Sequence, residues 1–316
     1  MKWQLLLEVP ADLAGERIDR ALARLSQQSE GPLSRGESRR LIDAGRVYLN
    51  GRRVKLAGKI VAAGDSVSTV EAEAAAEPVT KGGMDWAASI LFEDDDLLVV
   101  NKPSGIPSQP TRDPLRDNAV DSVSRYLSAR EGRQLVVKLA HRLDRDTSGV
   151  LVMTKSDRAI SRMGEAFAAR TTKKTYVAVA RDRLGTAEAE WQVDDHLAPQ
   201  KLEGGMTVMR SVHRGGDRAT TQFRTLARGD GFIWVEAQPV TGRMHQIRAH
   251  LAGCKLPILG DLLYGGPRTA GGHSAGRVML HARQLCFPHP VTREPLVIEA
   301  PVPDDMRCFA VESGPF

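Results

Sequence analysis

His141-Arg142-Leu143-Asp144-Arg145-Asp146-Thr147-Ser148-Gly149 places five ionisable side chains between two apolar segments. The apolar residues 135–137 come before this stretch, and residues 150–153 follow it with the composition of a buried strand. Burying a charge is costly unless the charge is paired. A solvated turn between two strands is one interpretation, and a functional loop is the other, so the remaining motifs have to decide between them.

The composition is that of an ordinary globular protein, with 41% hydrophobic and 26% charged residues. Its 316 residues can form one large domain or two. The apolar run Leu5-Leu6-Leu7 is too short for a signal peptide, and no segment approaches the roughly 18 consecutive apolar residues of a membrane span. We therefore expect a cytoplasmic protein without a membrane partner.

The cysteines and histidines do not follow a metal-binding pattern. Cys254, Cys286 and Cys308 are lone and widely spaced, which matches neither zinc ligands nor a disulfide framework. The H-E-x-x-H motif of zinc enzymes does not occur in the sequence. We expect no metal site, and a reducing compartment.

Basic side chains are concentrated near the N-terminus of this chain, whose net charge is +5. Residues 34–59 contain eight basic side chains and two acidic ones, Glu37 and Asp43. Such a run is usually a solvated face. The alternative is a surface that binds nucleic acid, with an affinity that falls as salt neutralises the phosphates.

Two helices are expected in this basic region. Apolar residues at helical spacing predict one over residues 17–25, and the capping box formed by Ser34 and Glu37 predicts another over residues 35–44. The exposed side of the second helix would carry three of the arginines, Arg35, Arg39 and Arg40.

A hairpin follows, because the Asn50-Gly51 turn separates the strand-like residues 47–49 and 54–56. The two helices, the segment Arg46-Val47-Tyr48-Leu49-Asn50-Gly51 and the later Gly64-Asp65 together resemble the small RNA-binding domain shared with a ribosomal small-subunit protein. The resemblance implies RNA contact through five arginines, Arg35, Arg39, Arg40, Arg52 and Arg53.

The chain divides after this unit. Residues 71–86 are rich in Ala and Glu without a consistent period, which is typical of a linker, so we expect an RNA-binding domain at 1–70 and a catalytic domain at 87–316. The later patterns mix the two element types and predict an α+β fold around a mainly antiparallel sheet. Strands are expected at 90–92, 97–100, 150–153, 174–180, 220–226, 231–237 and 296–300, and helices at 121–127, 159–169 and 244–252.

Six ordered motifs of the larger domain are richer in reactive side chains than a scaffold requires. They are LLVVNKPSG (97–105), HRLDRDTSG (141–149), KKTYVA (173–178), TGRMHQIRAHL (241–251), GDLLYG (260–265) and LHARQLCFPHP (280–290). In this order they resemble the RluA family of RNA pseudouridine synthases over roughly residues 10–310, in the branch with an N-terminal RNA-binding domain.

The resemblance implies a reaction in which the bond between uracil and ribose is broken and the base is rejoined through carbon, without a cofactor. The family motif assigns the nucleophilic carboxylate to Asp144. A carboxylate in a dry pocket needs a nearby guanidinium to favour its charged form, and Arg248 is the family's counterpart, with Arg243 as the alternative. Tyr176 matches the aromatic residue that stacks on the uracil.

A uridine in folded RNA has to leave its stack before it can react. By resemblance, Arg142 fills the vacated position, Leu280 packs against the target base, and His141 orders the loop. The resemblance also implies RNA as the partner of a monomeric enzyme. Ribosomal large-subunit RNA is the expected substrate, and transfer RNA is the alternative.

Two segments depart from the common family pattern. Residues 106–110 read Ile-Pro-Ser-Gln-Pro, where many relatives have a valine-rich stretch and a histidine, and Asp217 stands where a lysine is common. Both lie outside the catalytic motifs. They bear on the choice of RNA target and leave the expected reaction unchanged.

Two other functions compete with this interpretation. Residues 272–276 match the G-x-S-x-G pattern of serine hydrolases at Ser274, but the residues before it are rich in glycine and no acid followed by histidine occurs downstream. The second alternative is an RNA-binding protein without catalysis. Binding alone does not require a carboxylate facing phosphate-rich RNA, so Asp144 argues for an enzyme.

Overall fold

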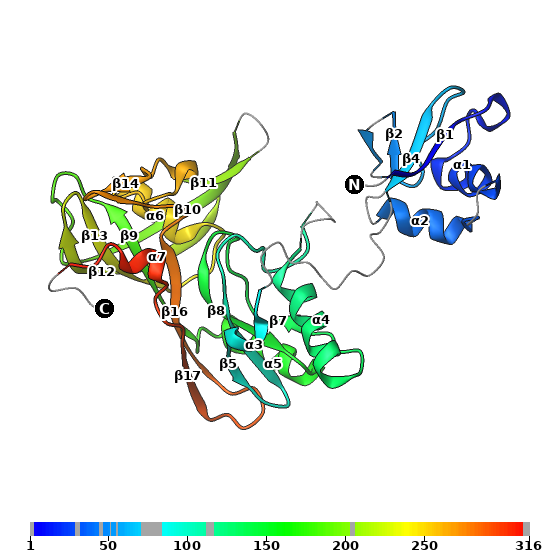
Figure 1. The fold of residues 1–316 in the computed structure, drawn as a ribbon. Helices are drawn as coiled ribbons and strands as arrows, with labels where there is room; N and C mark the ends of the chain where they lie inside the picture. Colours follow the sequence, from blue (N-terminus) through cyan, green and yellow to red (C-terminus); the bar gives the residue numbers. More distant parts are fainter. Residues whose placement is uncertain are drawn as a thin grey trace. The chain divides into compact units, whose positions relative to one another are not determined.

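The computed structural model describes residues 3–28, 32–43, 47–50, 52–54, 56–70, 84–111, 117–202 and 206–311. The chain forms two compact units, one of residues 1–84 and 110–117 and the other of residues 85–109 and 118–316 (Figure 1). Within the described ranges, no helix is both long and apolar enough to cross a membrane.

The N-terminal unit is a four-stranded antiparallel sheet with two helices. Its strand order is β1-β4-β2-β3. The elements are β1 (Trp3–Glu8), η1 (Ala11–Leu13), α1 (Ile18–Leu25), η2 (Ser26–Gln28), α2 (Arg35–Asp43), β2 (Val47–Leu49), β3 (Arg52–Arg53) and β4 (Ser66–Val70). The capping box is present, because Ser34 Oγ accepts from the Glu37 N–H and Glu37 accepts from the Ser34 N–H.

The hairpin of this unit differs from its prediction. Its second strand is at residues 52–53 and not at 54–56, because Asn50 adopts φ +51° and the tight turn pairs Leu49 directly with Arg52. Val54 then enters the core at 1% exposure, together with Ile18 and Leu22 of α1.

The second unit is built on an eleven-stranded sheet, which confirms the expected α+β class. The order is β11-β10-β12-β13-β9-β16-β8-β6-β5, with β17 beside β16 and β7 beside β8. Its strands are β5 (Ile90–Glu93), β6 (Leu97–Lys102), β7 (Lys138–Leu139), β8 (Ser148–Thr154), β9 (Lys173–Arg181), β10 (Glu190–Lys201), β11 (Thr207–Ser211), β12 (Asp217–Gly229), β13 (Phe232–Pro239), β16 (Leu280–Pro288) and β17 (Pro295–Glu299). A separate small hairpin is formed by β14 (Thr269–Ala270) and β15 (His273–Ser274).

Helices cover this sheet at both of its halves (Figure 1). The predicted helices at 121–127, 159–169 and 244–252 are present with shifted ends, and α6 packs on β11, β12 and β13. The helices are α3 (Trp86–Ser89), α4 (Ala119–Glu131), α5 (Asp157–Ala168), α6 (Gln246–Gly253), η3 (Leu262–Tyr264) and α7 (Asp304–Arg307).

One parallel contact, between β8 and β16, interrupts the antiparallel sheet. There Gly149 lies opposite Ala282 with φ +114°, and a Cβ atom on Gly149 would be 2.2 Å from the Ala282 carbonyl oxygen. Only glycine fits this approach. The contact brings the end of the 141–149 stretch to the middle of the sheet.

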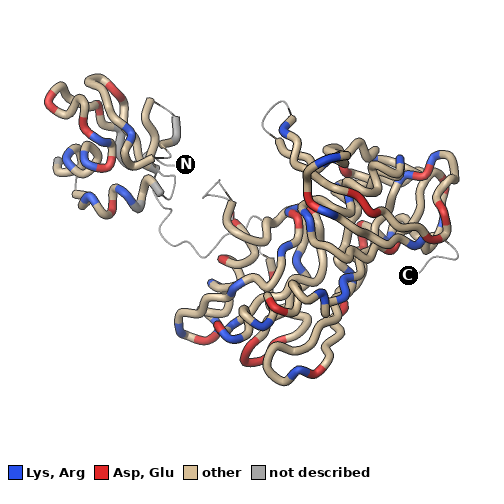
Figure 2. The backbone as a smooth tube through the Cα atoms, turned by 180° about the vertical axis from the view of Figure 1, so that it is seen from behind, with Lys and Arg blue, Asp and Glu red and all other residues tan. Residues whose placement is uncertain are grey.

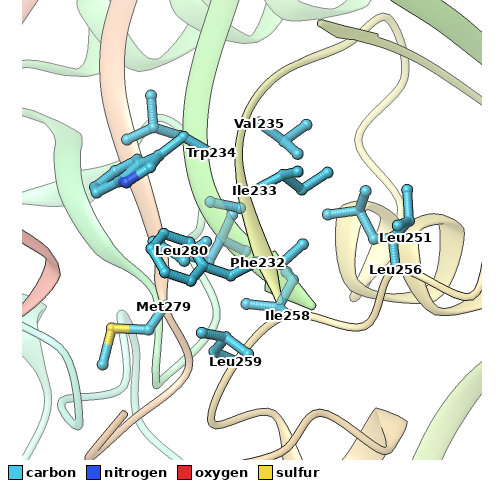
Figure 3. Close-up of a cluster of buried hydrophobic side chains, with 14 of the residues drawn as sticks. Phe232, Ile233, Trp234, Val235, Leu251, Leu256, Ile258, Leu259, Met279 and Leu280 are labelled. Carbon is cyan, nitrogen blue, oxygen red and sulfur yellow. The ribbon is translucent and has the colours of Figure 1, made fainter. Parts of the chain in front are cut away.

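A cluster of buried apolar side chains joins β9, β13, α6 and the first residue of β16 (Figure 3). Trp234 of β13 is 1% exposed, and its indole N–H donates to the Phe309 carbonyl oxygen at 2.7 Å. Leu251 of α6 and Met279 are fully buried in the same cluster. This rigid core fixes β9, β13 and α6 relative to one another.

Candidate active site

The charged stretch forms the loop between β7 and β8, and the segment 102–108 after β6 holds it. Ser108 Oγ donates to the Leu143 carbonyl oxygen at 2.8 Å and accepts from the Leu143 N–H at 3.1 Å. Ser104 Oγ donates to the Asp146 carbonyl oxygen at 2.7 Å. These bonds fix the backbone on both sides of Asp144.

Lys102 also binds the backbone of this loop. The side chain is 0% exposed, and its ammonium group donates to three carbonyl oxygens, those of Pro103, Ile106 and Arg145. Burial lowers the pKa of Lys102 to about 7, although the carboxylates of Asp146 and Asp144 act in the opposite direction. Lys102 is therefore a structural anchor of the loop.

The Asp144 carboxylate faces the guanidinium of Arg248. Arg248 Nη1 is 3.4 Å from Asp144 Oδ2, and the Asp144 side chain is 25% exposed whereas that of Arg248 is 6% exposed. Arg248 also donates two hydrogen bonds, at 2.7 and 2.8 Å, to the buried carboxylate of Asp261. Burial alone would lower the pKa of Arg248, but the bonds to Asp261 raise it above its ordinary value.

Helix α6 orients Arg248 through Gln246. The Gln246 side-chain oxygen accepts from the Thr241 hydroxyl at 2.7 Å, and its amide group donates to the Thr221 hydroxyl at 2.9 Å. Arg243 points elsewhere, since its Nη1 is 3.5 Å from Asp217 Oδ2. Of the two expected guanidinium groups, the fold therefore brings Arg248 to Asp144.

Tyr176 lies on β9 between Ala237 of β13 and Ala282 of β16. The ring is half-buried, and burial together with the negative charge of Asp144 raises the pKa of its hydroxyl. Tyr176 consequently keeps its proton at neutral pH. It presents an aromatic ring close to the carboxylate.

Comparisons with known proteins identify the family of this chain. Residues 96–253 match the family model described as RNA pseudouridylate synthase, and residues 16–67 match that of the S4 domain. The chain is 34% identical to the uncharacterized RNA pseudouridine synthase YlyB of Bacillus subtilis, over 96% of each chain. It is 33% identical to ribosomal large subunit pseudouridine synthase C of Escherichia coli K12, over 96% of this chain and 95% of that protein.

This chain belongs to the RluA family of RNA pseudouridine synthases. A solved structure, human RNA pseudouridylate synthase domain containing 4, has 27% sequence identity and a TM-score of 0.56, and the match covers 70% of this chain and 91% of that one. The expected enzyme class is confirmed.

The predicted RNA-contacting residues of the synthase unit differ in exposure. Arg142 is exposed beside Asp144, as a residue that enters an RNA stack has to be. Leu280 is 3% exposed and packs in the main core, opposite Ala178 of β9 (Figure 3). Leu280 therefore offers little surface to a base in this state of the enzyme.

In the S4 domain, Arg35 and Arg39 are exposed on α2. Arg35 Nε is 3.3 Å from Asp19 Oδ2, and Arg17 binds the same buried carboxylate at 3.0 Å. Arg35 is thus partly engaged within the fold, whereas Arg39 has no ion pair among the residues described. The side chains of the other predicted arginines, Arg40, Arg52 and Arg53, lie outside the described part of the structure.

His141 orders the loop. Its Nε2 accepts from the Val152 N–H at 3.1 Å, which requires a neutral ring with this nitrogen unprotonated. Burial, with a smaller effect of the Lys174 charge, lowers the pKa of His141 to about 3. The ring therefore serves as an acceptor for β8 and not as a proton donor.

Three residues at the site had no role in the sequence prediction, namely Asp261, Tyr264 and His245. The GDLLYG motif contains the first two, but their contacts with α6 depend on the turn after Leu259. That turn requires Gly260, where a Cβ atom would be 1.8 Å from the Arg277 carbonyl oxygen. The sequence signal that could have indicated Asp261 is an acidic residue in a loop between Gly260 and Gly265.

Proposed function

We propose that this synthase isomerises specific uridines of ribosomal large-subunit RNA in the cytoplasm, as a monomer, with Asp144 as its nucleophile. The observation that carries the proposal is the Asp144 carboxylate, three-quarters buried, 3.4 Å from a guanidinium that is itself held by Asp261. A guanidinium that is held in place in this way favours the ionised form of the carboxylate and fixes its position.

The chemistry requires no oxidation or reduction. The N1–C1′ bond of uridine breaks, a C5–C1′ bond forms, the proton on C5 leaves and N1 gains a proton, so substrate and product are isomers. Asp144 supplies the electron pair that assists this exchange. The Tyr176 ring provides a face on which uracil stacks while it turns.

Access to Asp144 requires that the target base leaves its helix, at a cost of a few kcal/mol. We infer that Arg142, which is exposed two residues before Asp144, enters the space that the base leaves. An arginine suits this role because its planar guanidinium stacks on neighbouring bases and binds phosphates.

Two observations support RNA of the large ribosomal subunit as the substrate. The relatives of Escherichia coli and Vibrio vulnificus are named ribosomal large subunit pseudouridine synthases. The S4 domain adds a basic helix, and Figure 2 shows Lys and Arg along its helical side. Phosphate contacts of this kind give affinity without reading sequence.

The test is a map of pseudouridines across total RNA, by a chemical modification that stalls reverse transcription. It compares cells that lack this protein with the same cells supplied with wild type, Asp144→Asn or Ser274→Ala. We expect sites in large-subunit RNA to be restored by wild type and by Ser274→Ala, and not by Asp144→Asn.

Each alternative has its own outcome. Restored sites in transfer RNA would replace the proposed substrate and leave the catalytic assignment in place. Equal restoration by Asp144→Asn and wild type would remove Asp144 from the role of nucleophile. The exposed Ser274 is the matched control, because it belongs to the G-x-S-x-G sequence and lies outside the site.

A further inference from the structure

His245 has an unusual backbone conformation at the edge of the site. It precedes α6 with φ +52° and ψ 20°, in the left-handed region that residues other than glycine seldom occupy. The turn is held by neighbouring bonds, since Gln246 accepts from the Arg243 N–H and the Ala249 N–H donates to the His245 carbonyl oxygen. Residues held in this way cluster at functional sites.

A relay of hydrogen bonds orients the His245 ring. The Met209 N–H donates to the Tyr264 hydroxyl oxygen at 2.7 Å, and that hydroxyl is 3.1 Å from His245 Nδ1. Among the residues described, Nδ1 is the acceptor available to the Tyr264 proton. Tyr264 therefore donates to Nδ1, and the remaining ring proton has to lie on Nε2.

The Nε2 atom faces the reactive carboxylate. It lies 3.9 Å from Asp144 Oδ2, the same oxygen that Arg248 approaches at 3.4 Å. Oδ1 of Asp144 has no partner in the described part of the chain. Burial lowers the pKa of His245, which keeps the ring neutral beside the arginine.

We propose that His245 is a positioning residue for Asp144, in which the Nε2–H group and Arg248 together hold Oδ2 so that Oδ1 is the oxygen that reacts. The inference rests on the proposed role of Asp144 as nucleophile. The distance of 3.9 Å is longer than a hydrogen bond, and catalytic bonds of this kind commonly shorten when substrate binds. Tyr264 contributes by setting the tautomer of His245.

The relay predicts how substitutions combine. Tyr264→Phe frees His245 to place its proton on Nδ1 and to turn a lone pair toward the carboxylate. We expect kcat to fall about tenfold with KM within about twofold, because a small displacement of a reacting group costs this much. His245→Asn, whose side chain is too short for either contact, should show a similar loss. The double variant should be no slower than His245→Asn alone.

These expectations are tested by measuring single-turnover and steady-state rates on the mapped RNA target. The four proteins compared are wild type, Tyr264→Phe, His245→Asn and the double variant. Tyr126→Phe on α4 serves as a tyrosine control with unchanged kcat. If Tyr264 were only structural, Tyr264→Phe would reduce kcat by the same factor with and without His245, and this result would overturn the inference. So would wild-type kcat in His245→Asn, which folds readily because asparagine tolerates the left-handed conformation.

The same assay shows separately whether Asp144 is the nucleophile. If it is not, the Asp144→Asn variant remains active. An inactive Asp144→Asn beside a fully active His245→Asn would refute the role of His245 alone.

Discussion

At the scale of single residues, this enzyme keeps several histidines neutral by burial. His281 on β16 is 0% exposed, its Nδ1 is 2.9 Å from the Ser148 hydroxyl, and its Nε2 is 3.3 Å from the Ala300 carbonyl oxygen. Burial lowers the pKa of His281 to about 4 from its usual 6.5. The ring joins β8 to β16 beside the loop that carries Asp144.

This histidine makes stability depend on pH. Between pH 6.5 and about 4 the unfolded chain binds a proton at His281 that the folded chain does not, so the free energy of unfolding falls as the pH falls. We expect wild type to lose about 2 kcal/mol more than His281→Gln between pH 7 and pH 5. Urea unfolding at the two pH values measures the difference, and equal losses in both proteins would contradict it.

At the scale of elements, the segment after β6 acts as a clamp on the loop before β8. Ser108 has both of its bonds to Leu143, one residue from Asp144. This serine lies in the segment 106–110, which the resemblance predicts to bear on the choice of RNA target. Through Ser108 the same segment also binds the loop that carries Asp144.

Ser108→Ala should reduce kcat about tenfold with little change in KM, because it loosens the backbone beside the nucleophile. Ser128→Ala on α4 is the matched control. Ser128 Oγ likewise accepts from a backbone N–H, that of Leu135 at 2.9 Å, and donates to a carbonyl oxygen, that of Ser124 at 2.7 Å, away from the site. Steady-state kinetics should show unchanged kcat in Ser128→Ala, and a parallel loss in both variants would indicate that only stability is affected.

At the scale of the whole molecule, we expect the S4 domain to supply affinity for RNA and the synthase unit to supply the reaction. Arg39 on α2 is exposed, whereas the exposed Arg24 is 2.9 Å from Glu16 within the same domain. If the S4 domain supplies affinity through phosphates, Arg39, which has no ion pair among the described residues, should matter more for RNA binding than Arg24.

We expect Arg39→Gln to raise KM several-fold without changing kcat, and to reduce the slope of log affinity against log salt by about 1. Arg24→Gln should keep the wild-type slope. Binding titrations at several salt concentrations give the slopes. A fall in kcat for Arg39→Gln, or equal slopes for wild type and Arg39→Gln, would show that α2 does not act through phosphate contact.

The sequence by itself determined the family, the α+β class and the candidate nucleophile. Ordered motifs carry this information because each short segment requires particular residue types. At position 149, for example, only glycine fits where β8 meets β16. Periodicity also located α4, α5 and α6. It missed β10, although exposed and half-buried residues alternate along most of this strand, and it missed β16, which begins with three consecutive buried residues.

Only the tertiary structure decided which charged groups meet. Asp144 and Arg248 are 104 residues apart, and the motif resemblance that favoured Arg248 kept Arg243 as an alternative. The choice depends on how α6 packs against the sheet and on Asp261, which binds Arg248 from a third segment. Long-range packing sets these distances, because a side chain's neighbours across a sheet follow from strand order and not from spacing along the chain.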